Sequence, residues 1–225
     1  MKKRVFEAER TLEGYTRLSW EDESGRRGAD EYLFTAGSVA WPHEMLPGII
    51  LMAGKEQKSE RVLVFVEREF RSFSEAVEIF DSFWNQYLPA YYYCLADSDR
   101  EIKKSRGFIM HLRMDERMRE KLPFAFAPNA DNIDYGHQLI KDYLNKTQLM
   151  VPAAGILAAQ LQGNFTSTDD SLYAVEALRY LLAGILVCPF KVEKKEIRRA
   201  PRDGSEVAWL ELAAIRERLE ETDGW

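Results

Sequence analysis

The chain has 225 residues, of which 46% are hydrophobic and 30% are charged, with a formal net charge of −6 at pH 7. This is ample apolar material for a packed core, either in one domain with a terminal appendage or in two small domains. The acidic balance excludes a surface that is basic throughout, so any contact with nucleic acid would need a local basic patch.

No apolar run reaches the roughly 18 residues that a membrane-spanning helix needs, so no membrane association is expected. Acidic residues close to the N-terminus argue against a signal peptide. Cys94 and Cys188 lie in apolar runs and are expected to be reduced core residues, not a disulfide. These features predict a cytoplasmic protein.

In chain order, the polar residues 1–37 are expected to form an N-terminal extension. Within it, residues 4–20 predict two strands or one long ribbon, and residues 21–30 a loop. Residues 38–41 are then expected to be a short extended stretch that Pro42 ends.

The β-branched and apolar residues 47–54 and 61–70 predict two buried strands joined by a charged turn, which form an antiparallel hairpin. A helix comes next, with Ser72 or Ser74 as its N-cap, and it ends before Pro89.

Strands and helices then alternate. The predicted strands cover residues 91–96, 123–128 and 149–152. The predicted helices cover residues 132–145, 153–162 and 172–185, and a basic amphipathic segment covers residues 110–121. A hairpin and this alternation after it predict an α/β fold over residues 38–190. It would be a mixed central sheet of about five or six strands with helices on both faces. Tyrosines 91–93 could stack on bases, but a strand this apolar favours core packing.

The tail, residues 191–225, is predicted to be a basic linker and then an amphipathic helix. Its basic cluster includes Lys194, Lys195, Arg198 and Arg199. The cluster is equally consistent with phosphate contacts and with a solvated face. The tail is expected to serve a partner more than the fold.

One carboxylate, Glu176, stands in the apolar helical phrase of residues 173–180 (YAVEALRY). Tyr173, Glu176 and Tyr180 fall at i, i+3 and i+7 and so share one side of the helix. An unpaired buried charge is costly, and a metal ion or a hydrogen-bond network would account for it. The alternative, which spacing alone favours, is a Glu at the helix edge that is paired with Arg179 or solvated.

Asp97 is the second candidate site residue. It comes directly after the apolar strand predicted over residues 91–96, and Asp99 lies two positions further on. Open sheets bind ligands beyond the carboxyl ends of their strands, which makes this position a candidate. Asp is also an ordinary turn former, and taken alone the turn interpretation is favoured.

Four passages, in the expected order, resemble the nuclease domain of the large terminase subunit of tailed phages, which has a ribonuclease H-like fold. Residues 38–51 resemble the family's first strand and the small apolar strand after it, residues 64–70 its third strand, and residues 95–97 the end of its fourth strand. Residues 173–180 resemble the helix phrase HAxDALRY, the most specific of the four. The resemblance covers about residues 38–187.

The resemblance implies roles for particular residues. Asp97 and Glu176 fall on catalytic metal-binding aspartates of the family, with Glu in place of Asp at position 176. Tyr173 falls where the family commonly has a His near the metals. Ala40 falls on the first-strand Asp that touches both ions, and alanine provides no ligand although two-metal hydrolysis needs a bridging carboxylate. Five acids could lie near the pocket, and one of them could substitute for it: Glu44, Glu69, Asp99, Asp169 and Asp170.

The resemblance also implies a two-metal site for Mg²⁺ or Mn²⁺, degenerate through Ala40, and partners that include double-stranded DNA and a packaging ATPase or portal-type phage proteins. The first hypothesis is therefore a terminase-type DNA endonuclease domain of phage DNA packaging, catalytically impaired, acting in the host cytoplasm. The second is a non-catalytic terminase-like docking or regulatory module. The third, from outside the family, is a protein-interaction protein that uses its acidic surface and tail helix.

Overall fold

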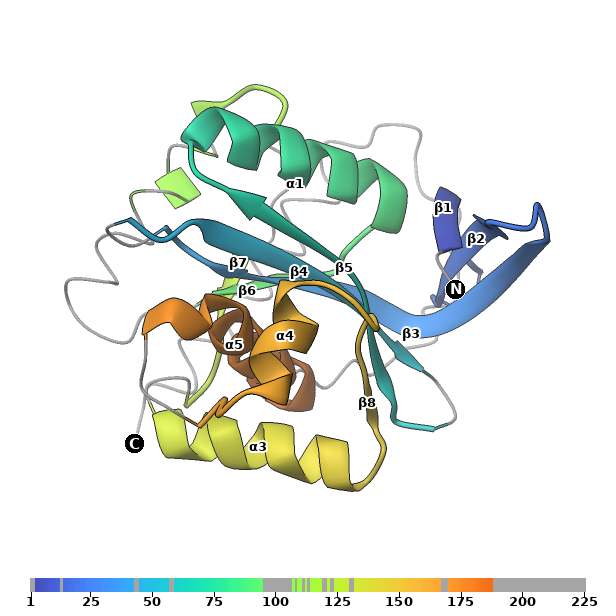
Figure 1. Cartoon of the computed structure of the whole chain (residues 1–225). Coiled ribbons are helices and arrows are strands. Elements are labelled where there is room, and N and C mark those ends of the chain that lie inside the picture. The colour runs from blue at the N-terminus through green and yellow to red at the C-terminus, as the bar shows by residue number, and fades with distance from the viewer. Residues whose placement is uncertain are drawn as a thin grey trace, which may run out of the picture. The chain divides into compact units, whose positions relative to one another are not determined.

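The computed structural model of the chain (Figure 1) describes residues 3–187 except 13, 43–44, 57–58, 95–106, 108, 111, 113, 119–120, 122–123, 130–131 and 167–169. Several sequence predictions therefore lie outside the described residues. They concern Cys188, the whole tail from residue 191, and the candidate acids Glu44, Asp97, Asp99 and Asp169.

Five strands form the centre of the sheet, in the spatial order β5-β4-β3-β6-β7. Three are the consecutive antiparallel strands β3 (Arg27–Ala40), β4 (Gly48–Glu56) and β5 (Val62–Phe70). β6 (Tyr92–Cys94) then pairs in parallel with β3, and β7 (Phe124–Phe126) in parallel with β6. Strands β3, β5, β6 and β7 consequently run in one direction and end at the same edge of the sheet, which we call the carboxyl edge.

Three further strands extend the sheet, so that the described residues form eight strands and not the five or six expected. β1 (Lys3–Arg10) pairs with β2 (Thr16–Asp22), which pairs with the first half of β3, while β8 (Leu149–Met150) pairs with β5. At Tyr32, β3 pairs with β2 on one side and β4 on the other. The N-terminal residues are therefore part of the sheet.

The prediction of a loop over residues 21–30 is wrong, because the chain forms a tight turn there. The Asp22 side-chain Oδ1 accepts hydrogen bonds from the backbone N–H groups of Ser24 (2.9 Å) and Arg26 (3.1 Å), and β3 begins at Arg27. An Asp side chain that bonds to the backbone ahead of it stabilises such a turn. The extended stretch expected over residues 38–41 is the end of this long strand, so the boundary expected at residue 38 falls inside β3.

Helices cover both faces of the sheet, as the sequence predicts (Figure 1). α1 (Phe73–Tyr87) lies on one face, and α3 (Ile133–Asn145), α4 (Ile156–Gln162) and α5 (Tyr173–Val187) lie on the other. Strand order and layers together give an α/β fold, a mixed sheet with helices on both faces. None of the helices in the described part of the chain is long and apolar enough to span a membrane.

The core has two layers because successive side chains of a strand point to opposite faces. Phe80 of α1 packs against Tyr92 in the α1 layer, and Tyr93 belongs to the α5 layer with Leu178 and Leu182. Tyr92 and Tyr93 are both buried, which confirms core packing for these tyrosines.

The predicted N-cap of α1 is confirmed at Ser72. The Ser72 Oγ accepts a hydrogen bond from Glu75 N (3.2 Å), and the Glu75 carboxylate accepts one from Arg71 N (2.6 Å). Such reciprocal capping satisfies backbone donors that a helix start leaves without partners.

Candidate functional site

Strands β3, β4 and β5 each contribute one residue to a row at the carboxyl edge. Ala40 of β3 is opposite Ile49 of β4, and Ile49 is opposite Glu69 of β5. Ala40 and Ile49 belong to the core layer that α5 covers, so the row lies on the α5 face. Ala40 is 4% exposed, whereas Glu69 is exposed. The edge thus has an alanine where the terminase resemblance expects an Asp, and a carboxylate two strands away.

α5 begins beside this row. The Tyr173 hydroxyl, in the first turn of the helix, donates a hydrogen bond to Glu69 Oε1. Burial raises the pKa of Tyr173 above its ordinary value, and the hydrogen bond to Glu69 and the negative charges of Glu69 and Glu67 raise it further. The phenol therefore stays protonated at neutral pH and remains a donor to the carboxylate.

Glu176 lies one turn further along α5 and is half-exposed. Its side chain is 39% exposed, and its Oε1 lies 3.8 Å from Nη1 of Arg179, whose side chain is 4% exposed. The sequence suggested a buried carboxylate, but the alternative of a Glu at the helix edge paired with Arg179 describes the structure. Tyr180, expected on the same side as Glu176, is buried in the core, with the Arg179 guanidinium over its ring at 5.8 Å.

Two polar residues that the sequence analysis missed hold the starts of α4 and α5. The Glu67 carboxylate of β5 accepts hydrogen bonds from Ile156 N and Leu157 N (3.1 Å), the first residues of α4. Gln160 of α4 accepts at Oε1 from Ala174 N (3.0 Å) and Val175 N (3.2 Å) in the first turn of α5. No local pattern indicates the first contact, because Glu67 lies 89 and 90 residues from its partners.

The donors in this region suit a hard cation in kind but not in number. Carboxylate oxygens such as those of Glu69 and Glu176 are the ligands that Mg²⁺ prefers. Within the described residues, however, no group of three or more His, Cys, Asp or Glu side chains is close enough together to hold a metal ion. Both carboxylates already contact protein groups, the Tyr173 hydroxyl and the Arg179 guanidinium.

The structure brings together part of the predicted site. Ala40, Glu69 and Tyr173 lie along one edge, and Glu176 stands on the same helix as Tyr173. β6 ends at Cys94 at this edge, but Asp97, Asp99 and Glu44 lie outside the described residues, as do the tail residues Lys194, Lys195, Arg198 and Arg199. The distance between Asp97 and Glu176 stays a prediction.

No protein-family model matches the chain, and no curated protein matches it. The solved structures that are similar to it include three phage proteins. The large terminase nuclease of the thermophilic phage G20c is 12% identical, with a TM-score of 0.44, over 78% of this chain and 90% of that one. Its zinc-bound form is also 12% identical, with a TM-score of 0.41, over 77% and 91%.

The third is the large terminase of another thermophilic bacteriophage, 13% identical with a TM-score of 0.49, over 68% of this chain and 40% of that one. Identities this low transfer no residue's role, so the chemistry of the site has to come from this chain's own residues. All three structures are large terminases or their nuclease domains, the family that the four sequence passages resemble.

Proposed function

We propose that this chain is a terminase-type nuclease domain that cleaves double-stranded DNA with Mg²⁺ or Mn²⁺, and that Ala40 impairs its activity. The observation that supports the proposal is the row of Ala40, Ile49 and Glu69 at the carboxyl edge, with α5 starting beside it. An edge where parallel strands end is where open α/β sheets bind ligands.

In this proposal Asp97 and Glu176 bind the metal ions, and Glu69, held by Tyr173, is an auxiliary carboxylate. Bound metals would activate water for attack on the phosphodiester and stabilise the leaving oxygen. Glu69 lies in the same row as Ala40, so it is the described acid best placed to offset the missing ligand.

The proposed partners rest on the same assignment. Double-stranded DNA would be the substrate, and Lys194, Lys195, Arg198 and Arg199 of the tail would contact its phosphates, since cationic side chains supply most of the non-specific affinity for DNA. A packaging ATPase or portal-type phage proteins would be the protein partners.

The test is cleavage of supercoiled DNA in Mn²⁺ by the unmodified chain, by Ala40→Asp and by Ala40→Asn. We expect weak or absent cleavage by the unmodified chain and stronger cleavage by Ala40→Asp, because Asp restores a bridging carboxylate. Asn has nearly the same size without the charge, so Ala40→Asn should not gain activity. Robust cleavage by the unmodified chain would show that another acid, such as Glu69, supplies the ligand.

Thermal unfolding gives a second readout that does not depend on turnover. A charged Asp at a position as buried as Ala40 costs stability unless a cation compensates it. Ala40→Asp should therefore melt below the unmodified chain in EDTA and recover in Mn²⁺, because a ligand that binds only the folded state raises its stability. Ala40→Asn should not respond to Mn²⁺.

A second candidate function is a non-catalytic docking or regulatory module. The observation that favours it is that the carboxylates of Glu69 and Glu176 both contact protein donors, while Ala40 offers no ligand. In that case Ala40→Asp would show neither cleavage nor recovery in Mn²⁺, and the unmodified chain would still bind DNA or a packaging protein.

A further inference from the structure

Three hydrogen-bonded links connect β5 to α4, α4 to α5, and α5 back to β5. Glu67 of β5 holds the start of α4, Gln160 of α4 holds the start of α5, and Tyr173 of α5 returns to Glu69 of β5. Glu67 and Glu69 are two residues apart on one strand and so point to the same face. The links therefore form a closed ring above the carboxyl edge.

The first link depends on a backbone position that favours glycine. Gly155, the N-cap of α4, has φ +135°, and a Cβ at this position would collide with the Glu67 carboxylate. Glycine adopts such a conformation without a steric penalty. The missing side chain lets Glu67 approach the N–H groups of Ile156 and Leu157 closely.

The second link depends on the side chain of Gln160, which makes three hydrogen bonds. Gln160 is half-buried, and besides accepting from Ala174 N and Val175 N it donates from Nε2 to the Ser171 carbonyl oxygen (2.8 Å). The first N–H groups of a helix have no partners within the helix. Gln160 thus caps α5 from another helix and fixes the position where α5 begins.

That position decides where Tyr173 meets Glu69, because Tyr173 is the residue before Ala174. It also decides where Glu176 stands, three residues later on the same helix. We propose that Gln160 is a positioning residue of the candidate site, which sets the start of α5 so that Tyr173 binds Glu69 and Glu176 faces the carboxyl edge. The role of Glu176 in this inference rests on the proposed function, whereas the Tyr173–Glu69 contact does not.

The experiment uses the full chain with Gln160→Met, Gln160→Glu and the control Gln162→Met. Methionine keeps the length and removes both polar groups, whereas glutamate keeps an acceptor for the two N–H groups of α5. Gln162 is an exposed residue at the end of the same helix. The readouts are the ring chemical shifts of isotope-labelled tyrosine at neutral pH, with Tyr173 assigned from a Tyr173→Phe sample, and Mn²⁺ affinity by calorimetry.

We expect Gln160→Met to shift the ring resonances of Tyr173, because the phenol loses its fixed contact with Glu69. Gln162→Met should leave these resonances as in the unmodified chain. Gln160→Glu keeps the acceptor for the two N–H groups of α5 but sets a carboxylate oxygen against the Ser171 carbonyl oxygen, so its shift should be smaller than that of Gln160→Met. If Mn²⁺ binds, Gln160→Met should weaken it by about 10- to 100-fold, as loss of an outer contact of a metal site does.

Unchanged Tyr173 resonances in Gln160→Met would overturn the inference, and so would a Gln160→Glu variant whose shift exceeds that of Gln160→Met. The melting temperature of each variant, compared with Gln162→Met, shows whether a general loss of the fold accounts for the change. If Tyr173 responds as expected while no variant binds Mn²⁺ or cleaves DNA, the positioning of α5 by Gln160 stands and the proposed nuclease function fails.

Discussion

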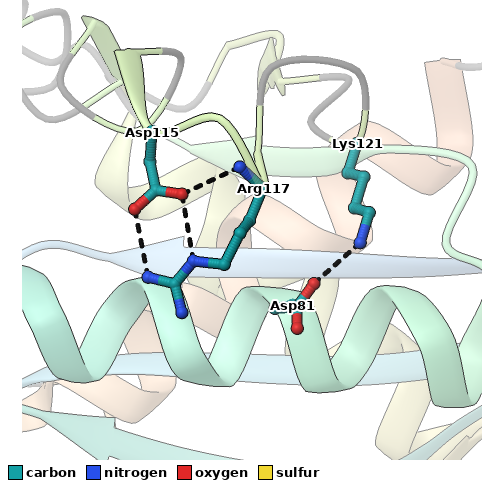
Figure 2. A network of polar contacts seen from close by, with 4 residues as sticks. All are labelled: Asp81, Asp115, Arg117 and Lys121. Atoms are coloured by element: carbon teal, nitrogen blue, oxygen red, sulfur yellow. Dashed lines mark hydrogen bonds and ion pairs between the residues drawn. The ribbon is translucent and has the colours of Figure 1, made fainter.

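The α1 face and the α5 face of the sheet differ in where their polar contacts lie. On the α1 face the contacts shown in Figure 2 are ion pairs near the surface. Lys121 Nζ lies 2.8 Å from Asp81 Oδ1 of α1, and Arg117 forms two side-chain hydrogen bonds of 3.1 Å with Asp115. On the α5 face the polar contacts join the starts of two helices to β5.

The two faces also differ in which helix end is fixed by a hydrogen bond to the sheet. On the α1 face it is the end of α1, where Thr35 Oγ1 of β3 donates to the Tyr87 carbonyl oxygen (2.6 Å), and apolar packing holds the rest of the helix. Phe80 of α1 packs edge-on against Tyr92 and Phe124, with ring centroids 4.8 and 5.5 Å away, and is fully buried. Apolar attraction is strong but non-directional. The capping contacts of Glu67 and Gln160 are directional and set the start of α4 and α5 to a particular residue.

The largest expected effect comes from removing the apolar anchor of α1. Phe80→Ala should reduce the free energy of unfolding by about 3–5 kcal/mol, because it removes buried area and leaves a cavity. Chemical denaturation measures this. Phe73→Ala, at a position 37% exposed at the start of the same helix, should cost clearly less. Equal costs for the two variants would contradict the view that packing of Phe80 holds α1.

The next effect tests the α5 face at Gly155. Gly155→Ala should cost about 1–3 kcal/mol, because an alanine at φ +135° is strained and its Cβ meets Glu67. Gly163, at the other end of α4, is the matched control, with φ −82° and no atom closer than 3.5 Å to an added Cβ. Gly163→Ala should be neutral or stabilise the fold by up to about 1 kcal/mol. Similar losses in both variants would argue against a specific contact at Glu67.

A smaller effect concerns His137 of α3, which is buried with its ring edge-on to Phe165. Burial lowers the pKa of His137 below its ordinary value of 6.5, and the positive charges of Arg179 and Lys141 lower it further. The negative charge of Asp134 raises this pKa and so offsets part of the shift. The unfolded chain therefore takes up this proton at a higher pH than the folded chain does. The stability that neutral His137 contributes is present above pH 6.5 and is lost as the pH falls through the folded pKa.

Denaturation between about pH 7 and pH 5 checks this expectation. His137→Gln cannot take up the proton, so its free energy of unfolding should fall less over this range than that of the unmodified chain. Parallel curves for the two proteins would show that His137 does not contribute to the pH dependence.

Much of the fold could be predicted because its signals are local. The β4–β5 hairpin is indicated by two apolar runs, and α1 by Ser72 and an apolar stripe ended by Pro89. The length of β3 could not be predicted, because its first half is polar on one side and becomes a strand only by pairing with β2.

The candidate site was predictable only in part, for the same reason. Glu69 and Tyr173 were named as auxiliary residues, but the hydrogen bond between them joins positions 104 residues apart. The contacts of Glu67 have no sequence signal, since a Glu on a half-exposed strand normally faces solvent. The exposure of Glu176 depends on where α5 meets the sheet edge, which helical spacing alone does not specify.

The smallest expected effect is that of the ion pair between Lys121 and Asp81. Both side chains are about one third exposed, at 30% and 32%, so solvent screens the attraction and the pair should contribute no more than about 1 kcal/mol. Lys121→Met, Asp81→Asn and the double variant form a cycle whose coupling energy measures the pair itself. Salt at about 1 M should remove most of that coupling, because the screening length falls to roughly 3 Å. A coupling that exceeded the cost of Gly155→Ala, or that persisted in salt, would show that polar contacts hold the α1 face as firmly as they hold the start of α4.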